Sequence, residues 1–175
     1  YRTMIRKATP DDIDQIEKIY AAIHDAEENG TLTIGWLRGV YPVRKTAVDG
    51  IARGDMVVAV DGGEVVAAAV INQIQLPGYA DCRWVNDVPD SEIMVLHTLV
   101  VDPRIQSEGH GTAFVKFYEQ YALDHGCRYL RMDTQEKNAG ARRFYKKLGF
   151  SELGITTGVF NGIPDVRLVC LEKKL

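Results

Sequence analysis

The sequence predicts a mixed α/β domain in which helices flank a central sheet. Two observations indicate this fold class. Strand patterns at residues 56–60 and 65–71, joined by a tight turn, predict a hairpin. Farther along, a strand pattern at 93–101, an amphipathic helix at 111–124 and a strand pattern at 128–133 predict a strand-helix-strand crossover. Hairpins and a crossover in one chain are typical of a mixed sheet.

The first third of the chain predicts a strand followed by two helices. Residues 4–8 have the pattern of a short strand, and the Thr-Pro-Asp-Asp sequence at 9–12 favours the start of a helix. Apolar side chains that recur at helical spacing should form the core face of this helix: Ile13, Ile16, Ile19, Tyr20 and Ile23. Residues 27–54 have a mixed pattern, and the aromatic and apolar residues at 36–42 suggest a second helix and a loop.

The remaining elements are a long loop, a helix and two strands. Residues 73–91 are irregular, and a loop of that length inside a compact domain is usually functional. A helix is expected at 138–148, and strands near 151–157 and 165–171 close the chain. No repeat, low-complexity tract or linker interrupts the sequence, so we expect residues 1–175 to form a single domain.

Composition and charge exclude several classes of protein. Apolar residues make up 46% and charged residues 26%, which are ordinary values for a globular domain. The net charge of −3 lacks the basic excess of a nonspecific nucleic-acid binder. No apolar stretch approaches the roughly 18 residues of a membrane span, and no signal peptide is visible. We therefore expect a cytoplasmic protein with no nucleic-acid or membrane partner.

The cysteines indicate neither a disulfide framework nor a metal site. Cys82, Cys127 and Cys170 are odd in number and form no CxxC pair, which favours reduced thiols in the cytosol. His110, His125 and Cys127 do not have the spacing of a compact zinc site, so no metal is expected.

The most informative segment runs from Val101, at the end of a predicted strand, to the helix that begins at Gly111. Gly109 and Gly111 allow the backbone to approach a ligand closely, and free N–H groups at a helix start attract phosphate oxygens. Gly-x-Gly also occurs in plain turns. The Gly-Lys-Ser/Thr sequence of a P-loop and a complete Rossmann G-x-G-x-x-G are both missing, which argues against a nucleotide-binding protein.

This segment closely resembles motif A of the GNAT superfamily of N-acetyltransferases, in which a strand ending in Val-x-Pro precedes Gln/Arg-x-x-Gly-x-Gly/Ala. The matching residues are Val101, Pro103, Gln106, Gly109 and Gly111. The family's motif B is matched downstream by Asn138, Ala141, Phe144, Tyr145, Gly149 and Phe150. The resemblance covers residues 93–150. It implies a mixed, mostly antiparallel central sheet with helices on both faces.

The resemblance also implies acetyl-CoA as the acetyl donor. In the family, motif A holds the pyrophosphate, and the strand before it pairs with the pantetheine arm as an added strand would. The residues expected to bind the cofactor are Leu99, Val100, Val101, Ile105, Gln106, Ser107, Glu108, Gly109, His110, Gly111, Thr112, Asn138, Ala141 and Tyr145. Glu108 stands where the family often has a basic or neutral residue, and we expect its carboxylate to point to solvent.

Acetyl transfer by direct attack in a ternary complex needs a base for the amine and an acid for the leaving thiolate. Tyr145 matches the motif B tyrosine that sits near the thioester sulfur in the family, and we expect it to be the acid. The alternative is that Tyr145 packs beside Phe144 as a core residue.

His97 is the candidate base. Its ordinary pKa of about 6.5 suits a base at neutral pH, and its strand resembles that of arylalkylamine N-acetyltransferases, which have a histidine at this position. The two-residue period of a strand places His97, Leu99 and Val101 on one face. A packed core histidine is the alternative role, and Glu92 is the alternative base.

The acceptor is expected to be a primary amine on a small molecule or peptide. In the family, acceptor pockets come from segments that correspond here to 27–54 and 73–92. The second segment carries four acidic residues against Arg83 alone, which suggests a cationic acceptor; they are Asp81, Asp87, Asp90 and Glu92. The alternative functions are a non-catalytic acyl-CoA-binding module, and an acyltransferase with another acyl donor or a hydroxyl acceptor. Strand edges expected near the C-terminus would allow a homodimer.

Overall fold

The computed structural model describes residues 3–105 and 109–175. Its strands are β1 (Thr3–Lys7), β2 (Met56–Asp61), β3 (Glu64–Asn72), β4 (Ile93–Val101), β5 (Tyr129–Gln135), β6 (Ser151–Phe160) and β7 (Ile163–Lys174). Its helices are α1 (Ile13–Glu28), α2 (Arg44–Arg53), α3 (His110–Asp124) and α4 (Ala139–Lys147), with short 3₁₀ helices η1 (Pro10–Asp12), η2 (Pro77–Asp81) and η3 (Asp90–Glu92). The predicted order of strands and α-helices is therefore confirmed.

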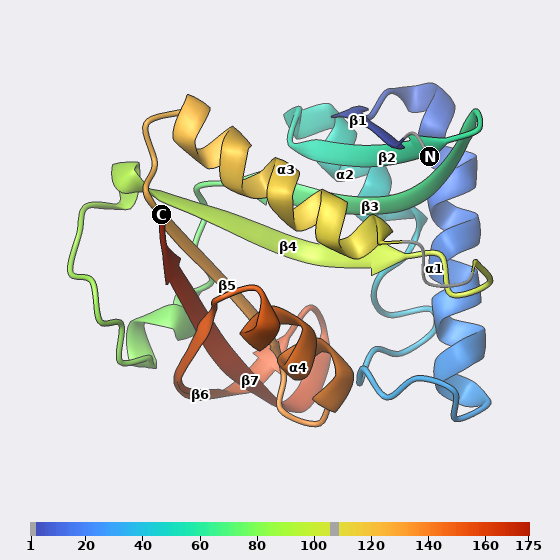
Figure 1. The fold of residues 1–175 in the computed structure, drawn as a ribbon. Helices are drawn as coiled ribbons and strands as arrows, with labels where there is room; N and C mark the ends of the chain where they lie inside the picture. The colour runs from blue at the N-terminus through green and yellow to red at the C-terminus, as the bar shows by residue number, and fades with distance from the viewer. Residues whose placement is uncertain (1–2, 106–108) are drawn as a thin grey trace.

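The described strands form one sheet in the order β1-β2-β3-β4-β5-β7-β6. Neighbouring strands are antiparallel at every junction between described strands except β4–β5, where they are parallel and are joined by the α3 crossover. Figure 1 shows α3 lying across the strands on the near side of the sheet. The mixed, mostly antiparallel sheet is the one that the sequence predicts.

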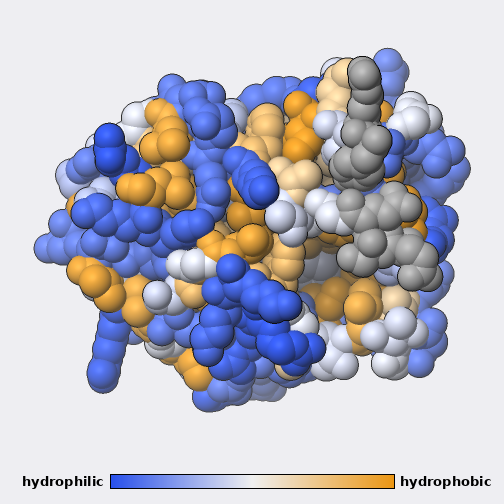
Figure 2. Space-filling view, viewed as in Figure 1, coloured by the Kyte–Doolittle hydropathy of each residue, from blue (hydrophilic) through white to orange (hydrophobic). Residues whose placement is uncertain are grey.

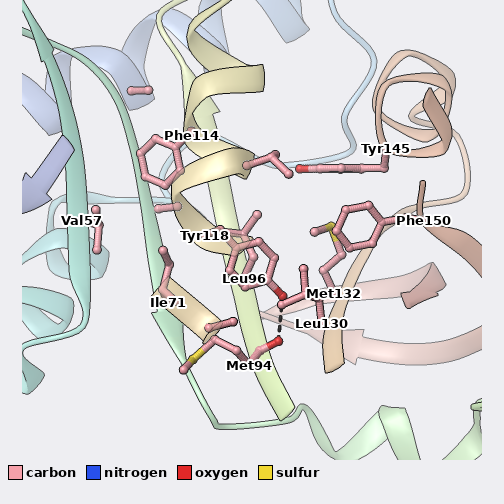
Figure 3. Packing of buried hydrophobic residues seen from close by; sticks show 14 of the residues in the cluster. Val57, Ile71, Met94, Leu96, Phe114, Tyr118, Leu130, Met132, Tyr145 and Phe150 are labelled. Carbon is pink, nitrogen blue, oxygen red and sulfur yellow. Dashed lines mark hydrogen bonds between the residues drawn. The ribbon is translucent and has the colours of Figure 1, made fainter. Parts of the chain in front are cut away.

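Helices cover both faces of the sheet. On one, here called the α1/α2 face, Ile16 and Ile19 of α1 are buried against β2 and β3. On the other, the α3/α4 face, Phe114 and Tyr118 of α3 are fully buried. The Tyr118 hydroxyl donates a 2.7 Å hydrogen bond to the backbone carbonyl of Met94 in β4 (Figure 3), which fixes α3 on the sheet. No helix in the described part of the chain is both long and apolar enough to cross a membrane.

A bulge interrupts β4 in its middle. His97 is opposite Val70 of β3, and Val100 is opposite Ala68. One residue of β3 therefore stands against two residues of β4, and Thr98 has a positive φ of 53°. Such an extra residue shifts the alternation of side chains between the two faces of a strand.

The bulge separates His97 from the residues that were expected to share its face. His97 lies on the α1/α2 face with its partner Val70, whereas Leu99 and Val101 pack on the α3/α4 face. Val100 is also turned away, and its side chain is buried in the α1/α2 core. The prediction that His97, Leu99 and Val101 share a face is wrong, because it assumed an unbroken period of two.

Strands β4 and β5 are paired over their first three residues and diverge beyond them. Their pairing joins 93–95 to 129–131, although β4 continues to Val101 and β5 to Gln135. No further β4–β5 pair is formed by the residues that the structure describes. The diverging halves leave a V-shaped gap in the sheet, and their facing edges present backbone N–H and C=O groups that can bond to a ligand.

The second helix lies later in the chain than the sequence suggested. Residues 36–42 form an irregular turn with a β-bridge between Leu37 and Tyr41. The second helix of the chain is α2, which begins after this turn at Arg44. Gly39 has a positive φ of 76°, and Pro42 has no N–H to donate, so this segment does not continue as a helix. The turn places the Tyr41 hydroxyl in hydrogen-bond contact with the hydroxyl of Thr98 at the bulge.

The cysteines differ from the expectation of reduced thiols. Cys82, just after η2, forms a disulfide with Cys170 of β7. Cys127 is free and buried. The sequence could not indicate this pair, because the two cysteines are 88 residues apart and only the fold brings the 73–91 loop over β7.

Candidate active site

A cavity of about 400 Å³ lies on the α3/α4 face at the C-terminal end of β4. Figure 2 shows this face hollowed between α3 and α4, with apolar surface inside the hollow. The cavity is lined by Leu32, Leu99, Val101, Asp102, Pro103, Ile105, Gly109, His110, Gly111, Thr112, Gly140, Ala141, Phe144 and Tyr145. Motif A and motif B therefore form the walls of one cavity.

Most of the predicted cofactor-binding residues that the structure describes line this cavity. They are Leu99, Val101, Ile105, Gly109, His110, Gly111, Thr112, Ala141 and Tyr145. Val100 does not, because the bulge turns its side chain to the other face. Asn138 caps α4 instead, and its Oδ1 accepts a 3.1 Å hydrogen bond from the N–H of Ala141. Gln106, Ser107 and Glu108 lie outside the described residues.

The start of α3 suits an anionic ligand. Gly109, in a left-handed conformation with a φ of 80°, precedes the helix, and the first N–H groups of a helix have no partner inside it. A Cβ on Gly111 would lie 3.2 Å from the Phe144 ring, so glycine allows α3 and α4 to approach closely. The positive end of a 15-residue helix therefore opens into the cavity.

Tyr145 lies where the cavity meets the gap between β4 and β5. Its side chain extends from α4 toward α3 above Phe150 and Met132 (Figure 3), and it is 8% exposed. Burial raises the pKa of its hydroxyl, and the carboxylate of Asp133 raises the pKa further. Tyr145 therefore stays protonated at neutral pH, as an acid must.

Asp133 reaches the same gap from the opposite face of the sheet. It lies on β5 two residues beyond Arg131, which ends the β4–β5 pairing. Its Oδ2 accepts a 2.6 Å hydrogen bond from the Tyr79 hydroxyl. Burial raises the pKa of Asp133 to about 6, although the Tyr79 hydrogen bond acts against this rise. A carboxylate with a pKa near 6 is a suitable general base at neutral pH.

The comparison with known proteins decides the family. Residues 13–150 match the model of the acetyltransferase (GNAT) family. The chain belongs to the GNAT family. A curated relative, an uncharacterized N-acetyltransferase of Methanocaldococcus jannaschii, is 29% identical over 156 residues. That alignment covers 88% of this chain and 63% of the longer relative.

Solved structures show the same fold at low sequence identity. A GNAT-family acetyltransferase from Streptococcus agalactiae superposes with a TM-score of 0.81 at 22% identity, over 99% of this chain and 95% of its own. YncA of Salmonella typhimurium, a protein solved with its cofactor acetyl-CoA, superposes with a TM-score of 0.68 at 17% identity, over 100% and 95%. The ribosomal-protein-S18-alanine N-acetyltransferase of Escherichia coli superposes with a TM-score of 0.69 at 16% identity, over 99% of this chain and 94% of its own.

Within this GNAT fold, His97 is on the far side of the sheet from the motif A and motif B cavity. Its Nε2 is 2.8 Å from Oδ1 of Asn72. The amide group of Asn72 donates to Asp55, so Oδ1 faces His97 and Nε2 carries the hydrogen. Burial lowers the pKa of His97 to about 4, and Arg53 contributes to the lowering, although Asp55 acts against it. His97 is therefore neutral at pH 7 and a weak base.

The acidic residues of the 73–92 segment do not gather at the gap. Asp87 and Asp90 line another cavity, beside Arg131 and Trp84, in the region where β4 and β5 are still paired. Glu92, the alternative base, is exposed in η3 before β4 begins.

Two side chains at the gap were missed by reasoning from the sequence. Asp133 is expected at the end of a strand without any role, and Tyr79 is expected in a loop without any contact to Asp133. A signal for Asp133 exists, since it is an acidic residue on the strand between the two motifs. Tyr79 has none, because its contact with Asp133 spans 54 residues and depends on how the 73–91 loop folds back.

Proposed function

We propose that this GNAT protein transfers an acetyl group from acetyl-CoA to a primary amine by direct attack in a ternary complex. The observation that supports this most is that Tyr145 and Asp133 lie on opposite faces of the sheet and are near enough for the Asp133 carboxylate to raise the pKa of the Tyr145 hydroxyl. An acid and a base on the two sides of an opening are what an amine and a thioester need when they approach from opposite directions.

The α3/α4 face suits the donor. The positive helix end at Gly109 and Gly111 would hold the pyrophosphate. The free edge of β4 near Leu99 and Val101 would hydrogen-bond to the amides of the pantetheine arm, as an added strand does. The apolar walls of the cavity would then leave the thioester beside Tyr145. The relative YncA, solved with acetyl-CoA, supports this choice of donor.

Asp133 is the better candidate base. It would accept a proton from the acceptor ammonium, and the freed nitrogen lone pair would then form the C–N bond to the acetyl carbon. As the C–S bond breaks, Tyr145 would give its hydroxyl proton to the leaving sulfur. The second proton that the nitrogen loses would pass to solvent, and Tyr145 would regain one from solvent. His97 remains the alternative base, although its lower pKa makes it a weaker one.

Calorimetric titration tests the donor site first. We expect acetyl-CoA to bind with a Kd in the micromolar range, about 8 kcal/mol, and ATP and NAD to give no heat. A folded sample that fails to bind acetyl-CoA would refute the proposal. A non-catalytic acyl-CoA-binding module would bind but release no thiol with any amine, so thiol release across an amine panel separates the two functions. Competition with longer acyl-CoA compounds tests for another acyl donor. Alcohols included in the panel test for a hydroxyl acceptor.

Tyr145→Phe tests the acid. The variant keeps the ring that packs between Phe144 and Phe150 and removes the proton. We expect acetyl-CoA affinity to stay within about twofold and kcat to fall about 100-fold, the lower end of the effect of a general acid. Unchanged turnover would assign Tyr145 to core packing instead.

A further inference from the structure

A second cavity, of about 450 Å³, lies on the α1/α2 face next to the bulge of β4. It is lined by Tyr41, Val43, Lys45, Thr46, Asp49, Arg53, Val70, Asn72, Ile74, His97 and Asn161. Tyr41 joins this cavity to the gap, because its hydroxyl contacts Thr98 at the bulge. The cavity beside Arg131 reaches Asp133 through Tyr79, whose hydroxyl is already bonded to that carboxylate, and Arg131 itself lies where β4 and β5 are still paired. The acceptor side of the gap is therefore next to the Tyr41 cavity.

The charges around this cavity differ from one end to the other. Its lining carries Lys45 and Arg53 against Asp49, a net charge of +1; Lys45 is paired with Asp49 at 2.6 Å, and Arg53 with Asp55 at 2.9 Å. Asp133, on β5 beside the gap, is not among the lining residues, but its carboxylate is near enough to act on the Tyr41 hydroxyl. Tyr41 is close to both charges: burial raises the pKa of its hydroxyl, Asp133 raises it further and Arg53 acts against the rise. A ligand that extends from Arg53 to Asp133 would thus contact a cation at one end and an anion at the other.

Arg53 is positioned to hold a carboxylate. Among the residues that the structure describes, its one hydrogen bond runs from Nε to Oδ2 of Asp55, at 2.9 Å. Its two terminal amino groups make no hydrogen bond within the same residues, and its side chain is 46% exposed. Arg131 and Arg142, by contrast, engage all three guanidinium nitrogens. Two free amino groups in one plane are the fork that binds a carboxylate through both oxygens.

We propose that the Tyr41 cavity binds the acceptor, and that the acceptor is a small zwitterionic amino acid. Arg53 would hold the carboxylate, and the ammonium group would face Asp133. This inference rests on the proposed acetyl transfer and names its substrate class. It replaces the cationic acceptor that the acidic 73–92 segment suggested, because those acidic side chains lie beside a different cavity or are exposed.

The test compares each acceptor with a matched compound that lacks the carboxylate. L-leucine, L-leucinamide and 3-methylbutylamine form one such set, and sets built on the other apolar and polar L-amino acids complete the panel. We expect thiol release with the best amino acid to exceed that with its amide by about 10- to 100-fold in kcat/KM, the worth of a charge-assisted pair. The amine of the amide is less basic than that of the amino acid, so a larger fraction of it is unprotonated and able to attack. This difference favours the amide and therefore works against the expected result. Amides or simple amines that equal or exceed their amino acids would overturn the inference and leave the acetyltransferase function intact.

Arg53→Gln assigns the effect to this side chain. We expect it to reduce the acid-to-amide ratio to about 1–3 while the Kd of acetyl-CoA stays unchanged. Arg44→Gln is the matched control, since Arg44 is on the same helix, is also paired with acids and is outside the cavity. Should Arg53→Gln not fold, Lys45→Gln removes the other cation of the lining without exposing Asp55, and we expect the ratio to fall several-fold. A ratio that neither variant changes would contradict the proposal.

Failure of the proposed function gives a different result. In that case acetyl-CoA would not bind, and the acceptor cavity can still be probed alone. The ¹⁵N–¹H signal of the Arg53 Nε group should move on titration with the L-amino acids and not with their amides. No difference between acids and amides in this titration would overturn the inference independently of the donor.

Discussion

The two cavities on either side of the sheet are assembled in different ways. Apart from Leu32, the donor cavity on the α3/α4 face is lined by residues from two short stretches, 99–112 and 140–145. The acceptor cavity on the α1/α2 face takes residues from 41–53, 70–74, 97 and 161. A site made of contiguous stretches leaves a motif in the sequence, whereas a site made of distant single residues does not. Substitutions that affect one cavity and leave the other intact test whether the donor and acceptor sites are separate.

Asp133→Asn should have the largest effect, and on the acceptor side alone. Removing a general base lowers kcat by about 10²–10⁴-fold, while the donor cavity, which Asp133 does not line, keeps its affinity for acetyl-CoA. Thiol-release kinetics and calorimetry measure the two quantities. A loss of acetyl-CoA affinity equal to the loss of kcat would mean that the two sides are not separable.

Unfolding should not account for that loss. The asparagine can still accept the hydrogen bond from Tyr79. Because burial raises the pKa of Asp133 from 3.8 to about 6, the native state binds its proton more tightly than the unfolded state. The contribution of this group to stability is therefore greatest below pH 3.8 and is lost as the pH rises through 6. Asp133→Asn should leave Tm at pH 7 equal or higher, and Asp124→Asn on the surface of α3 is the control for activity.

Removing the disulfide should cost about 2–4 kcal/mol of unfolding free energy. The Cys82→Ser, Cys170→Ser double variant frees the loop that carries Tyr79, and Cys170 is opposite Asp133 in the β5–β7 register. We expect the KM for the acceptor to rise and acetyl-CoA affinity to stay unchanged. Dithiothreitol should reproduce these effects in the wild-type protein and have none on the double variant. A wild-type protein that is equally stable with and without reductant would show that the loop is fixed without the disulfide.

Acidification should lower activity about tenfold between pH 7 and pH 5. A base with a pKa of about 6 is mostly ionised at pH 7 and mostly protonated at pH 5. The kcat/KM profile should therefore have an ascending limb centred near pH 6. A limb centred near pH 4 would indicate His97 instead. The Kd of acetyl-CoA measured at the same pH values separates this effect from one on the donor side.

His97→Gln should have the smallest effect on turnover. At saturating acceptor we expect kcat to change less than about threefold, against the hundredfold or more that loss of a general base would cause. Glutamine can still hydrogen-bond to Asn72, so the wall of the acceptor cavity should persist, and any change should be in the acceptor KM. A hundredfold fall in kcat would restore His97 as the base and remove that role from Asp133.

The same division explains how much could be predicted from the sequence. Element order and the residues of the donor cavity follow local patterns, such as the glycines at 109 and 111 before an amphipathic helix. The position of His97 could not be predicted, because one extra residue at the bulge reverses the face of every side chain beyond it. Asp133 and Tyr79 could not be paired either, since their contact and the disulfide beside it depend on the path of the 73–91 loop.

The disulfide also closes a covalent ring. Residues 82–170 form a continuous loop of chain that contains β4, α3, β5 and α4, and with them every described lining residue of the donor cavity except Leu32. A protease that cuts once within this ring separates no fragment from the protein. The nicked chain should run as one species on a non-reducing gel and as two after reduction. The donor half of the domain is thus protected against loss by cleavage, a protection that the segment before Cys82 does not share.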